Sequence, residues 1–172
     1  SGKTTLTKLL LRLSDVQDGH VRVDGQDIST CTQQSLRRQI AYVPQEALLF
    51  HRSIRENIAY GRPGASEEEI RRAAELANAL EFIDRLPSGL DTLVGERGVK
   101  LSGGQRQAMA LLMSTMTPIE FLILDEHTAA LDPKTAETIM ELTDKVVREK
   151  NLTTIMVTHN LRYAVEYGDR LI

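Results

Sequence analysis

Leucines at helical spacing predict a helix at the start of the chain. They recur every three or four residues, so they would form one apolar face of that helix. The leucines are Leu6, Leu9, Leu10 and Leu13. The residues before Leu6 therefore lie at the N-terminus of the predicted helix.

Short apolar runs farther along the chain predict strands. They cover residues 40–43, 121–124 and 153–157, and a shorter run at 170–172 predicts one more strand. Pro133 stands where a helix would begin between the second and third runs, and apolar residues follow it at helical spacing. Strands separated by helices pair in parallel through right-handed crossovers, and ligands bind at the carboxyl ends of such strands. We therefore expect an α/β fold with its site at that edge of the sheet.

The middle of the chain predicts helices rather than strands. Two pairs of residues have the spacing of capping boxes and predict helices that reach about Ile58 and about Leu80. The pairs are Ser53 with Glu56 and Ser66 with Glu69. We expect one domain in which a core built from residues 1–43 and 118–172 carries a mainly helical insertion over residues 44–117.

Composition favours a soluble chain and gives no sign of nucleic-acid binding. The 172 residues carry 21 Lys and Arg against 24 Asp and Glu, a net charge of −3. Such a balance lacks the basic footprint of a nucleic-acid-binding domain. Charged residues interrupt each apolar run well before the roughly 18 residues that a membrane span needs. Cys31 is the only cysteine, which excludes an internal disulfide and fits a reducing compartment.

The first residues match the end of a phosphate-binding loop. Gly2, Lys3 and Thr4 fit the last three positions of the pattern G-x-x-x-x-G-K-[ST], whose first glycine would precede Ser1. Glycine lets phosphate approach the backbone, Lys3 can reach terminal phosphates, and Thr4 can offer its hydroxyl to Mg²⁺. Since the chain starts inside this pattern and without methionine, we expect it to be cut from a longer protein. A chance tripeptide at a frayed terminus is the alternative.

Two acids after an apolar run indicate a catalytic position. Asp125 and Glu126 come directly after the run at 121–124. One carboxylate at such a strand end can hold Mg²⁺, and its neighbour can polarise the water that attacks a γ-phosphate. A solvated acidic turn is the alternative, and the phosphate-loop match upstream favours the catalytic interpretation.

Residues 101–105, with the sequence Leu-Ser-Gly-Gly-Gln, indicate a second anion site at a helix start. Gly103 and Gly104 leave backbone N–H groups accessible, and Ser102 adds a hydroxyl donor. The alternative is a helix cap with a flexible glycine pair. The acids that follow closely in the sequence weaken that alternative.

Together these segments resemble the ATP-binding cassette (ABC) ATPases. The resemblance implies a RecA-like P-loop NTPase core, a parallel sheet flanked by helices, with an inserted helical signature subdomain. The matching segments, in family order, are residues 2–5 for Walker A, Gln45 for the Q-loop, 101–105 for the signature, 122–126 for Walker B, 130–132 for the D-loop and His159 for the switch histidine.

The resemblance implies a role for each matching residue. Glu126 would be the general base, His159 would contact the γ-phosphate, and Gln45 would complete the catalytic set. Mg²⁺ would be held by Thr4, Gln45 and Asp125. The residues that bind ATP would be Ser1, Gly2, Lys3, Thr4, Thr5, Ser102, Gly103, Gly104, Gln105 and Asp132. Because the family sandwiches ATP between Walker A of one domain and the signature of another, Ser102 and Gly104 would act on the partner's nucleotide.

The two halves of the chain resemble different branches of the family. Residues 43–58 and 95–98 resemble exporter cassettes that are fused to membrane domains. Residues 125–130 and 158–160 resemble importer cassettes, since exporters usually carry Ala-Thr-Ser after the two acids. We therefore hypothesise a hybrid or an unusual subfamily member whose character changes within residues 105–108.

The function that the resemblance implies is Mg²⁺-dependent ATP hydrolysis that powers transport across a membrane. The partners would be a second nucleotide-binding domain, identical or different, and transmembrane domains, with no nucleic acid. The domain would lie on the cytoplasmic face of a membrane, and Gln45 and residues 96–98 would lie near the membrane partner. Two alternatives stay open: a non-transport ABC ATPase, and a catalytically silent fragment that serves as an interaction module.

Overall fold

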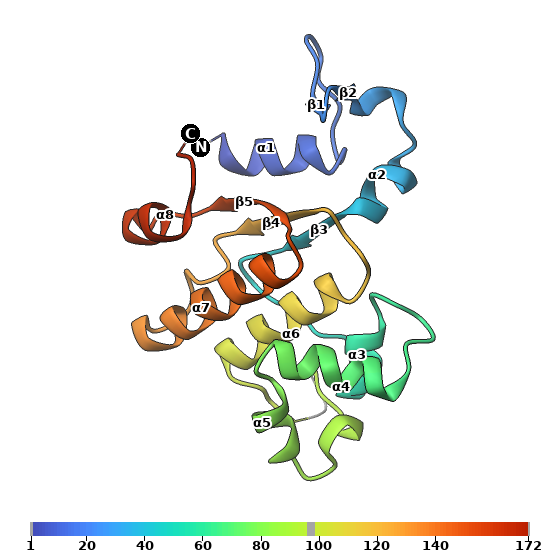
Figure 1. The fold of residues 1–172 in the computed structure, drawn as a ribbon, viewed down its shortest axis with the longest axis vertical. Coiled ribbons are helices and arrows are strands. Elements are labelled where there is room, and N and C mark those ends of the chain that lie inside the picture. The colour runs from blue at the N-terminus through green and yellow to red at the C-terminus, as the bar shows by residue number, and fades with distance from the viewer. Residues whose placement is uncertain (1, 96–98, 172) are drawn as a thin grey trace.

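A parallel sheet of three strands lies at the centre of the molecule (Figure 1). The computed structural model describes residues 2–95 and 99–171, apart from the side chains at positions 3 and 4. In the sheet, β4 (Phe121–Asp125) lies between β3 (Ile40–Val43) and β5 (Thr153–Val157), and both pairings are parallel. The three longer apolar runs are therefore strands, and the predicted α/β class is confirmed.

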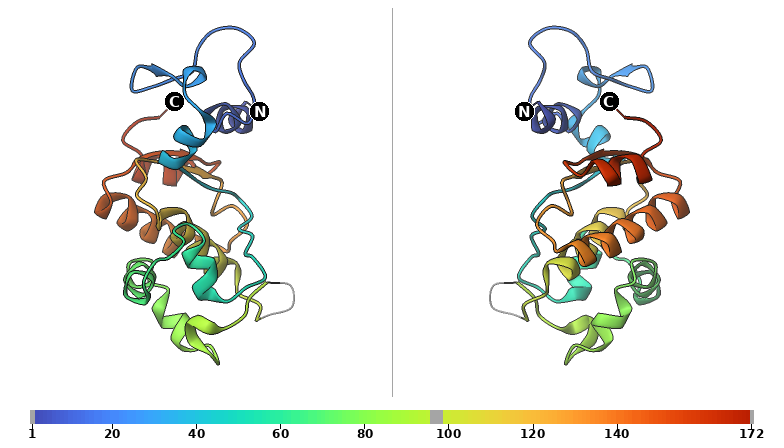
Figure 2. Two further views of the ribbon diagram at one scale, coloured as in Figure 1. Left: turned by 90° about the vertical axis from the view of Figure 1, so that its right-hand side faces the viewer. Right: turned by 90° about the vertical axis from the view of Figure 1, so that its left-hand side faces the viewer.

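Helices cover both faces of this sheet. Helix α1 lies on one face, and α6 and α7 lie on the other, as the edge-on views in Figure 2 also show. The remaining elements, in chain order, are α1 (Lys3–Leu10), β1 (Arg22–Val23), β2 (Gln26–Asp27), η1 (Ile28–Thr30), α2 (Gln33–Gln39), α3 (Ile54–Ala59), α4 (Glu67–Leu76), α5 (Leu80–Asp84), η2 (Gly89–Asp91), α6 (Gly103–Thr115), α7 (Pro133–Glu149) and α8 (Leu161–Tyr167).

Alternation along the strands divides the apolar core into two layers. Ile40 and Ile123 belong to a small layer on the side of α1, which includes Leu10. Val43 and Leu124, which are neighbours in the sheet, belong to a larger layer on the side of α6 and α7. Because successive strand residues point to opposite faces, Asp125 continues the α1 side of β4. The sheet thus presents its first acid to the face where α1 begins.

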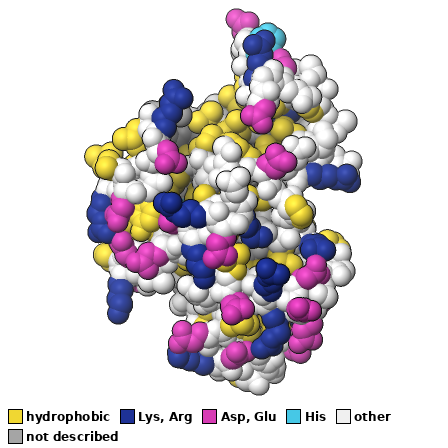
Figure 3. Space-filling view, in the orientation of Figure 1, with side chains coloured by type: hydrophobic (Ala, Val, Ile, Leu, Met, Phe, Trp, Pro, Cys, Tyr) yellow, Lys and Arg dark blue, Asp and Glu magenta, His cyan; other side chains and the backbone are white. Residues whose placement is uncertain are grey.

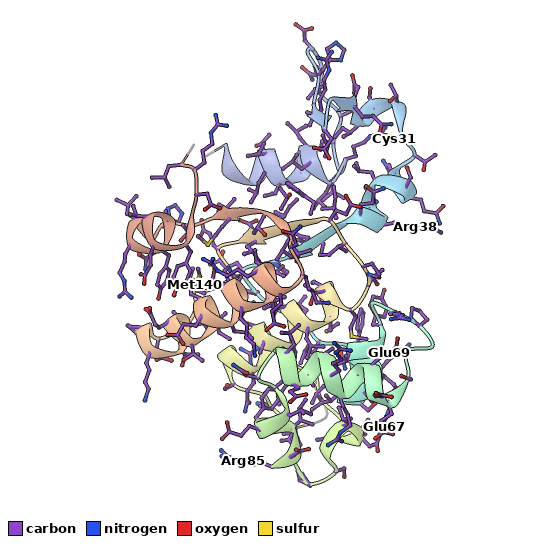
Figure 4. The ribbon with its side chains drawn as sticks, in the orientation of Figure 1. Cys31, Arg38, Glu67, Glu69, Arg85 and Met140 are labelled. Atoms are coloured by element: carbon purple, nitrogen blue, oxygen red, sulfur yellow. The ribbon has the colours of Figure 1, made fainter. Side chains whose placement is uncertain are left out.

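Both predicted capping boxes are present in the helical region. Ser53 caps α3 with Glu56, and Ser66 caps α4 with Glu69, which Figure 4 labels in the first turn of that helix. The second of these helices ends at Leu76 rather than near Leu80. The reason is Asn78, whose φ of 45° is left-handed and cannot continue a right-handed helix. A new helix, α5, begins after it.

The first helix is shorter than its leucine spacing predicts. It ends at Leu10, and Leu13 is 60% exposed. Arg12 has a left-handed φ of 47°, and its guanidinium donates to the carbonyls of Ile28 (3.0 Å) and Cys31 (2.7 Å). This distant anchorage turns the chain away from the helix axis before Leu13.

The strand predicted at 170–172 is wrong for the residues that the structure describes. Arg170 and Leu171 belong to no strand, and residue 172 lies outside the described residues. After α8 the chain leaves the sheet and runs towards the start of α1 (Figure 1). An apolar run becomes a strand only where a sheet edge pairs with it, and β5 is paired to β4 alone within the described sheet.

The helical region and the sheet share one apolar core. Val43 and Leu122 of the sheet lie in the same cluster as Ile54 and Ile58 of α3 and Met109 of α6. On the face seen in Figure 3, acidic and basic side chains are interspersed over α3 to α5. The division into a core of residues 1–43 and 118–172 and an insertion at 44–117 stays a prediction.

Candidate functional site

The carboxyl ends of the three strands bring four predicted site residues to one edge of the sheet. Gln45 follows β3, Asp125 ends β4 and is followed by Glu126, and His159 follows β5. The register fixes this arrangement, since Asp125 pairs with Val157 across β4 and β5. Parallel strands end at the same edge, and ligands of open α/β sheets bind there.

Glu126 and His159 are in direct contact. His159 Nε2 lies 2.7 Å from Glu126 Oε1, and the glutamate is 20% exposed whereas the histidine is 68% exposed. Glu126 holds a left-handed backbone with φ of 50°, and its N–H donates to the carbonyl of Val157 at 2.8 Å. Backbone strain of this kind costs on the order of 1–3 kcal/mol and concentrates at functional sites. A half-buried carboxylate beside an exposed imidazole can accept a proton from water.

Asp125 is held by Tyr42, a residue outside the motifs that the sequence analysis singled out. The hydroxyl of Tyr42 donates to Asp125 Oδ2 at 2.9 Å. Burial and this carboxylate raise the pKa of Tyr42 to about 12, so the phenol stays protonated and donates at neutral pH. The signal that could have revealed it is strand alternation. Tyr42 pairs with Ile123, so its side chain lies on the same face as Asp125, one diagonal step away.

The donor set at this edge fits a magnesium ion that also binds phosphate. Within residues 2–95 and 99–171, three or more His, Cys, Asp or Glu side chains nowhere gather into a metal site. Mg²⁺ does not need such a cage, because it keeps several waters and is bound through one or two carboxylates plus substrate phosphates. Asp125 offers one carboxylate at the end of β4, and Gln45, the second predicted ligand, lies two residues beyond the end of β3. The side chain of Thr4, the third predicted ligand, lies outside the description.

The predicted phosphate-binding residues stand at the start of α1. Gly2 is the N-cap, Lys3 is the first helical residue, and Thr5 lies in the first turn with an exposed side chain. A Cβ built on Gly2 would meet nothing within 4 Å, so packing within the chain does not require glycine there. Ser1 and the side chains of Lys3 and Thr4 lie outside the described parts. A helix start is an intrinsic anion site, as the sequence pattern requires.

The signature residues form a capping box at the start of α6. Ser102 Oγ accepts from the N–H of Gln105 at 3.2 Å, and Gln105 Oε1 accepts from the N–H of Ser102 at 2.8 Å. The capping box uses the N–H groups of Ser102 and Gln105 only, and other N–H groups of the first turn can still bind an anion. Residues 102–105 can therefore be both a helix cap and an anion site.

The two signature glycines pack against the start of α7. A Cβ on Gly104 would lie 2.4 Å from Thr135 Cγ2, and one on Gly103 would lie 2.9 Å from Leu131 Cδ2. Asp132 caps the same helix, and the hydroxyl and N–H of Thr135 lower the pKa of that carboxyl. The signature and the predicted D-loop residue are thus parts of one packed unit, a contact that the sequence pattern did not reveal.

His127, next to the predicted base, is buried within the protein. It is 2% exposed, and its Nε2 lies 3.2 Å from Thr143 Oγ1 on α7. Thr143 donates its own proton to the carbonyl of Ile139 at 2.7 Å, so it accepts from the histidine. Burial lowers the pKa of His127 to about 4, and the ring is neutral at pH 7. The turn that carries Glu126 is thereby joined to α7.

Comparison with known proteins identifies the family. The profile described as ABC transporter matches residues 1–129. The chain belongs to the ABC transporter family. This confirms the resemblance deduced from the motifs, and with it the predicted P-loop NTPase class of fold and the ATPase class of domain.

Exporters are prominent among the relatives of this ABC domain. The ATP-dependent lipid A-core flippase of Desulfotalea psychrophila is 48% identical over 93% of this chain and 28% of its own length. The beta-(1→2)glucan export ATP-binding/permease protein NdvA of Rhizobium johnstonii is 49% identical over 94% of this chain and 27% of its own. The structure of a bacterial Atm1-family ABC exporter with ATP bound matches with a TM-score of 0.85 and 43% identity, over 96% of this chain and 29% of that one.

The ABC domain spans less than a third of these relatives. Among the described residues, every helix is too short or too polar to cross a membrane. The two exporter relatives cover 93% and 94% of this chain, which includes both halves. The importer-like character of the second half stays a prediction. The same holds for the predicted place of residues 96–98 near a membrane partner, because those residues lie outside the description.

Proposed function

We propose that this ABC domain binds and hydrolyses ATP at the carboxyl edge of its sheet. The observation that carries the proposal is the 2.7 Å contact between Glu126 and His159, directly beside Asp125. Hydrolysis of the γ-phosphate needs a general base, an imidazole that orients it and a carboxylate that binds the metal, and these groups would lie here on adjacent strand ends.

In the proposed reaction, Glu126 accepts a proton from the water that attacks the γ-phosphate in line. His159 holds the carboxylate by its Nε2 and contacts the γ-phosphate with the same exposed ring. Asp125, Gln45 and Thr4 would hold Mg²⁺, which would supply positive charge to offset that of the phosphates. Ser1, Gly2, Lys3, Thr4 and Thr5 hold the phosphates at the start of α1, so catalysis is largely positional and electrostatic.

A second nucleotide-binding domain completes each site. Helices α1 and α6 lie on opposite faces of the sheet in Figures 1 and 2, which supports the view that their N-termini serve different nucleotides. In the proposed pair, the α1 start of one domain and Ser102, Gly103, Gly104 and Gln105 of the other enclose one ATP. Asp132 lies close to this interface because it caps the helix that packs on the signature.

Closing and opening of the pair would drive transport by transmembrane domains, which places the domain at the cytoplasmic face of a membrane. Two relatives are named as a flippase and an export protein, and a third is an exporter structure. These names support outward transport as the activity that the domain powers.

Glu126→Gln in the full-length protein tests the proposed base. We expect ATP turnover to fall by about 100-fold or more, because a positioned general base contributes roughly that factor. ATP binding, measured with a fluorescent analogue, stays at the wild-type level. Glu141→Gln, an exposed glutamate on α7, is the matched control and keeps the wild-type rate. An unchanged rate for Glu126→Gln would remove the glutamate from the mechanism.

A further inference from the structure

Tyr42 reaches Asp125 through the geometry of the sheet. The two strands pair Tyr42 with Ile123, and Asp125 lies two residues beyond that partner on the same face. A diagonal neighbour of this kind is within reach of an aromatic side chain. The ring packs against the small apolar layer, and the hydroxyl stands 2.9 Å from Asp125 Oδ2. The phenol is therefore placed by packing and aimed at one oxygen of one carboxylate.

A hydrogen bond to one carboxylate oxygen determines what the other oxygen can do. A free aspartate rotates and can present either oxygen, or both, to a cation. With Oδ2 engaged by the Tyr42 hydroxyl, rotation of the carboxylate is restricted, and Oδ1 keeps both of its lone pairs for a cation. Groups that hydrogen-bond to a metal-binding carboxylate orient it in this way, and their loss lowers metal affinity by about 10-fold to 100-fold.

The backbone around Tyr42 is anchored as well as its side chain, by hydrogen bonds from α6. Ser114 Oγ on α6 donates to the carbonyl of Tyr42 at 3.4 Å. Beyond the strand, Gln107 Nε2, also on α6, donates to the carbonyl of Gln45 at 2.7 Å. Gln107 is buried. One helix thus holds the short segment that carries both Tyr42 and Gln45.

We propose that Tyr42 is a positioning residue for the divalent metal of the bound nucleotide. It acts through Asp125, by holding Oδ2 so that Oδ1 faces the cation, and it does not itself touch metal or ATP. This inference rests on the proposed function, because it requires Asp125 to bind the metal.

Tyr42→Phe in the full-length protein tests the inference. The change removes the hydroxyl and keeps the packed ring. We measure Mn²⁺ binding in the presence of a non-hydrolysable ATP analogue, following free Mn²⁺ by electron paramagnetic resonance. We expect Mn²⁺ affinity to fall by about 10-fold, while affinity for the analogue without metal stays unchanged. Tyr167→Phe, which removes a phenol hydroxyl on α8, is the matched control and keeps wild-type Mn²⁺ affinity.

A double-variant cycle separates positioning from a merely structural role. In an Asp125→Asn background, Tyr42→Phe should cause no further loss of Mn²⁺ affinity, because its effect passes through the carboxylate. An equal loss in both backgrounds would overturn the inference. So would a Tyr42→Phe protein that binds Mn²⁺ as the wild type does. A wild-type protein that binds no Mn²⁺ with the analogue would overturn the proposed function as well, so the two failures are distinct.

Discussion

At the scale of single residues, close packing decides what two adjacent glycines are for. Gly104 meets the short, branched side chain of Thr135, which has little freedom to withdraw. Gly103 meets the far end of Leu131, which can rotate away. The same motif therefore contains one position where a side chain is excluded by the fold and one where it is tolerated.

Gly104→Ala should destabilise the chain far more than Gly103→Ala. We expect a loss of about 1–3 kcal/mol in the free energy of unfolding for Gly104→Ala, because overpacking forces the neighbouring helix to shift. For Gly103→Ala we expect a change within about 0.5 kcal/mol, since the helix preference of alanine offsets a small displacement of Leu131. Urea unfolding of both variants measures the difference. Equal losses would show that flexibility rather than packing selects these glycines.

His127 should make the domain sensitive to acid. Burial lowers its pKa from 6.5 to about 4, so between these values the unfolded chain binds a proton that the folded chain does not. The free energy of unfolding therefore carries no penalty from His127 above pH 6.5. It falls as the pH drops towards 4, by up to about 3 kcal/mol. His127→Gln removes this titration, and its unfolding free energy should vary less over that range. A slope equal to that of the wild type would contradict the explanation.

At the scale of elements, the loop that carries His159 is held by its flanking helix. Asn160 caps α8 by accepting from the N–H groups of Arg162 and Tyr163. Arg162 then reaches across to α7, where its Nη2 lies 2.7 Å and 2.8 Å from the two carboxylate oxygens of Glu137. The helix after His159 is thus tied to the helix that packs on Gly103 and Gly104.

Glu137→Gln should loosen α8 without unfolding the domain. The ion pair is largely exposed, so it contributes less than about 1 kcal/mol. We expect amide hydrogen exchange within α8 to accelerate by no more than about 5-fold, with global stability unchanged. Asp144→Asn breaks a different ion pair of α7, that with Arg148, and is the control that leaves α8 exchange unaltered. Faster exchange throughout the sheet would mean that the pair supports the whole fold.

At the scale of the whole molecule, the sheet separates the two helix starts that were predicted to bind ATP. Helix α1 and helix α6 are joined to opposite apolar layers. A single chain therefore holds half of each of two proposed sites. The proposed pair uses both halves, with Glu126 of one copy opposite Ser102 of the other.

Two inactive variants should restore activity to one another when the paired domains are identical. Ser102→Arg blocks the signature while sparing ATP binding by the single domain, and Glu126→Gln removes the base. A mixed pair keeps one site with both groups intact, so co-expression should recover about a quarter of the wild-type turnover by random pairing. ATPase assays of the mixture and of each variant alone measure this. A mixture as inactive as its components would place Ser102 and Glu126 in the same site of one chain.

Much of the fold was predictable because its determinants are local. The apolar strands, both capping boxes and Pro133 at the start of α7 follow from neighbouring residues, and so does the position of Lys3 at a helix start. Two of the failures were local patterns overruled from a distance. Leu13 left its helix because Arg12 is anchored to Ile28 and Cys31, and no described strand edge pairs with residues 170–171.

The sequence by itself determined the family, the order of the motifs and the placement of Gln45, Asp125, Glu126 and His159 at or just after strand ends. Only the tertiary structure decided which atoms meet. The contacts of Tyr42 with Asp125, of Glu126 with His159 and of Gly104 with Thr135 join segments that the chain order keeps apart. Such contacts depend on strand register and helix packing, which many distant residues set together, so no local pattern encodes them.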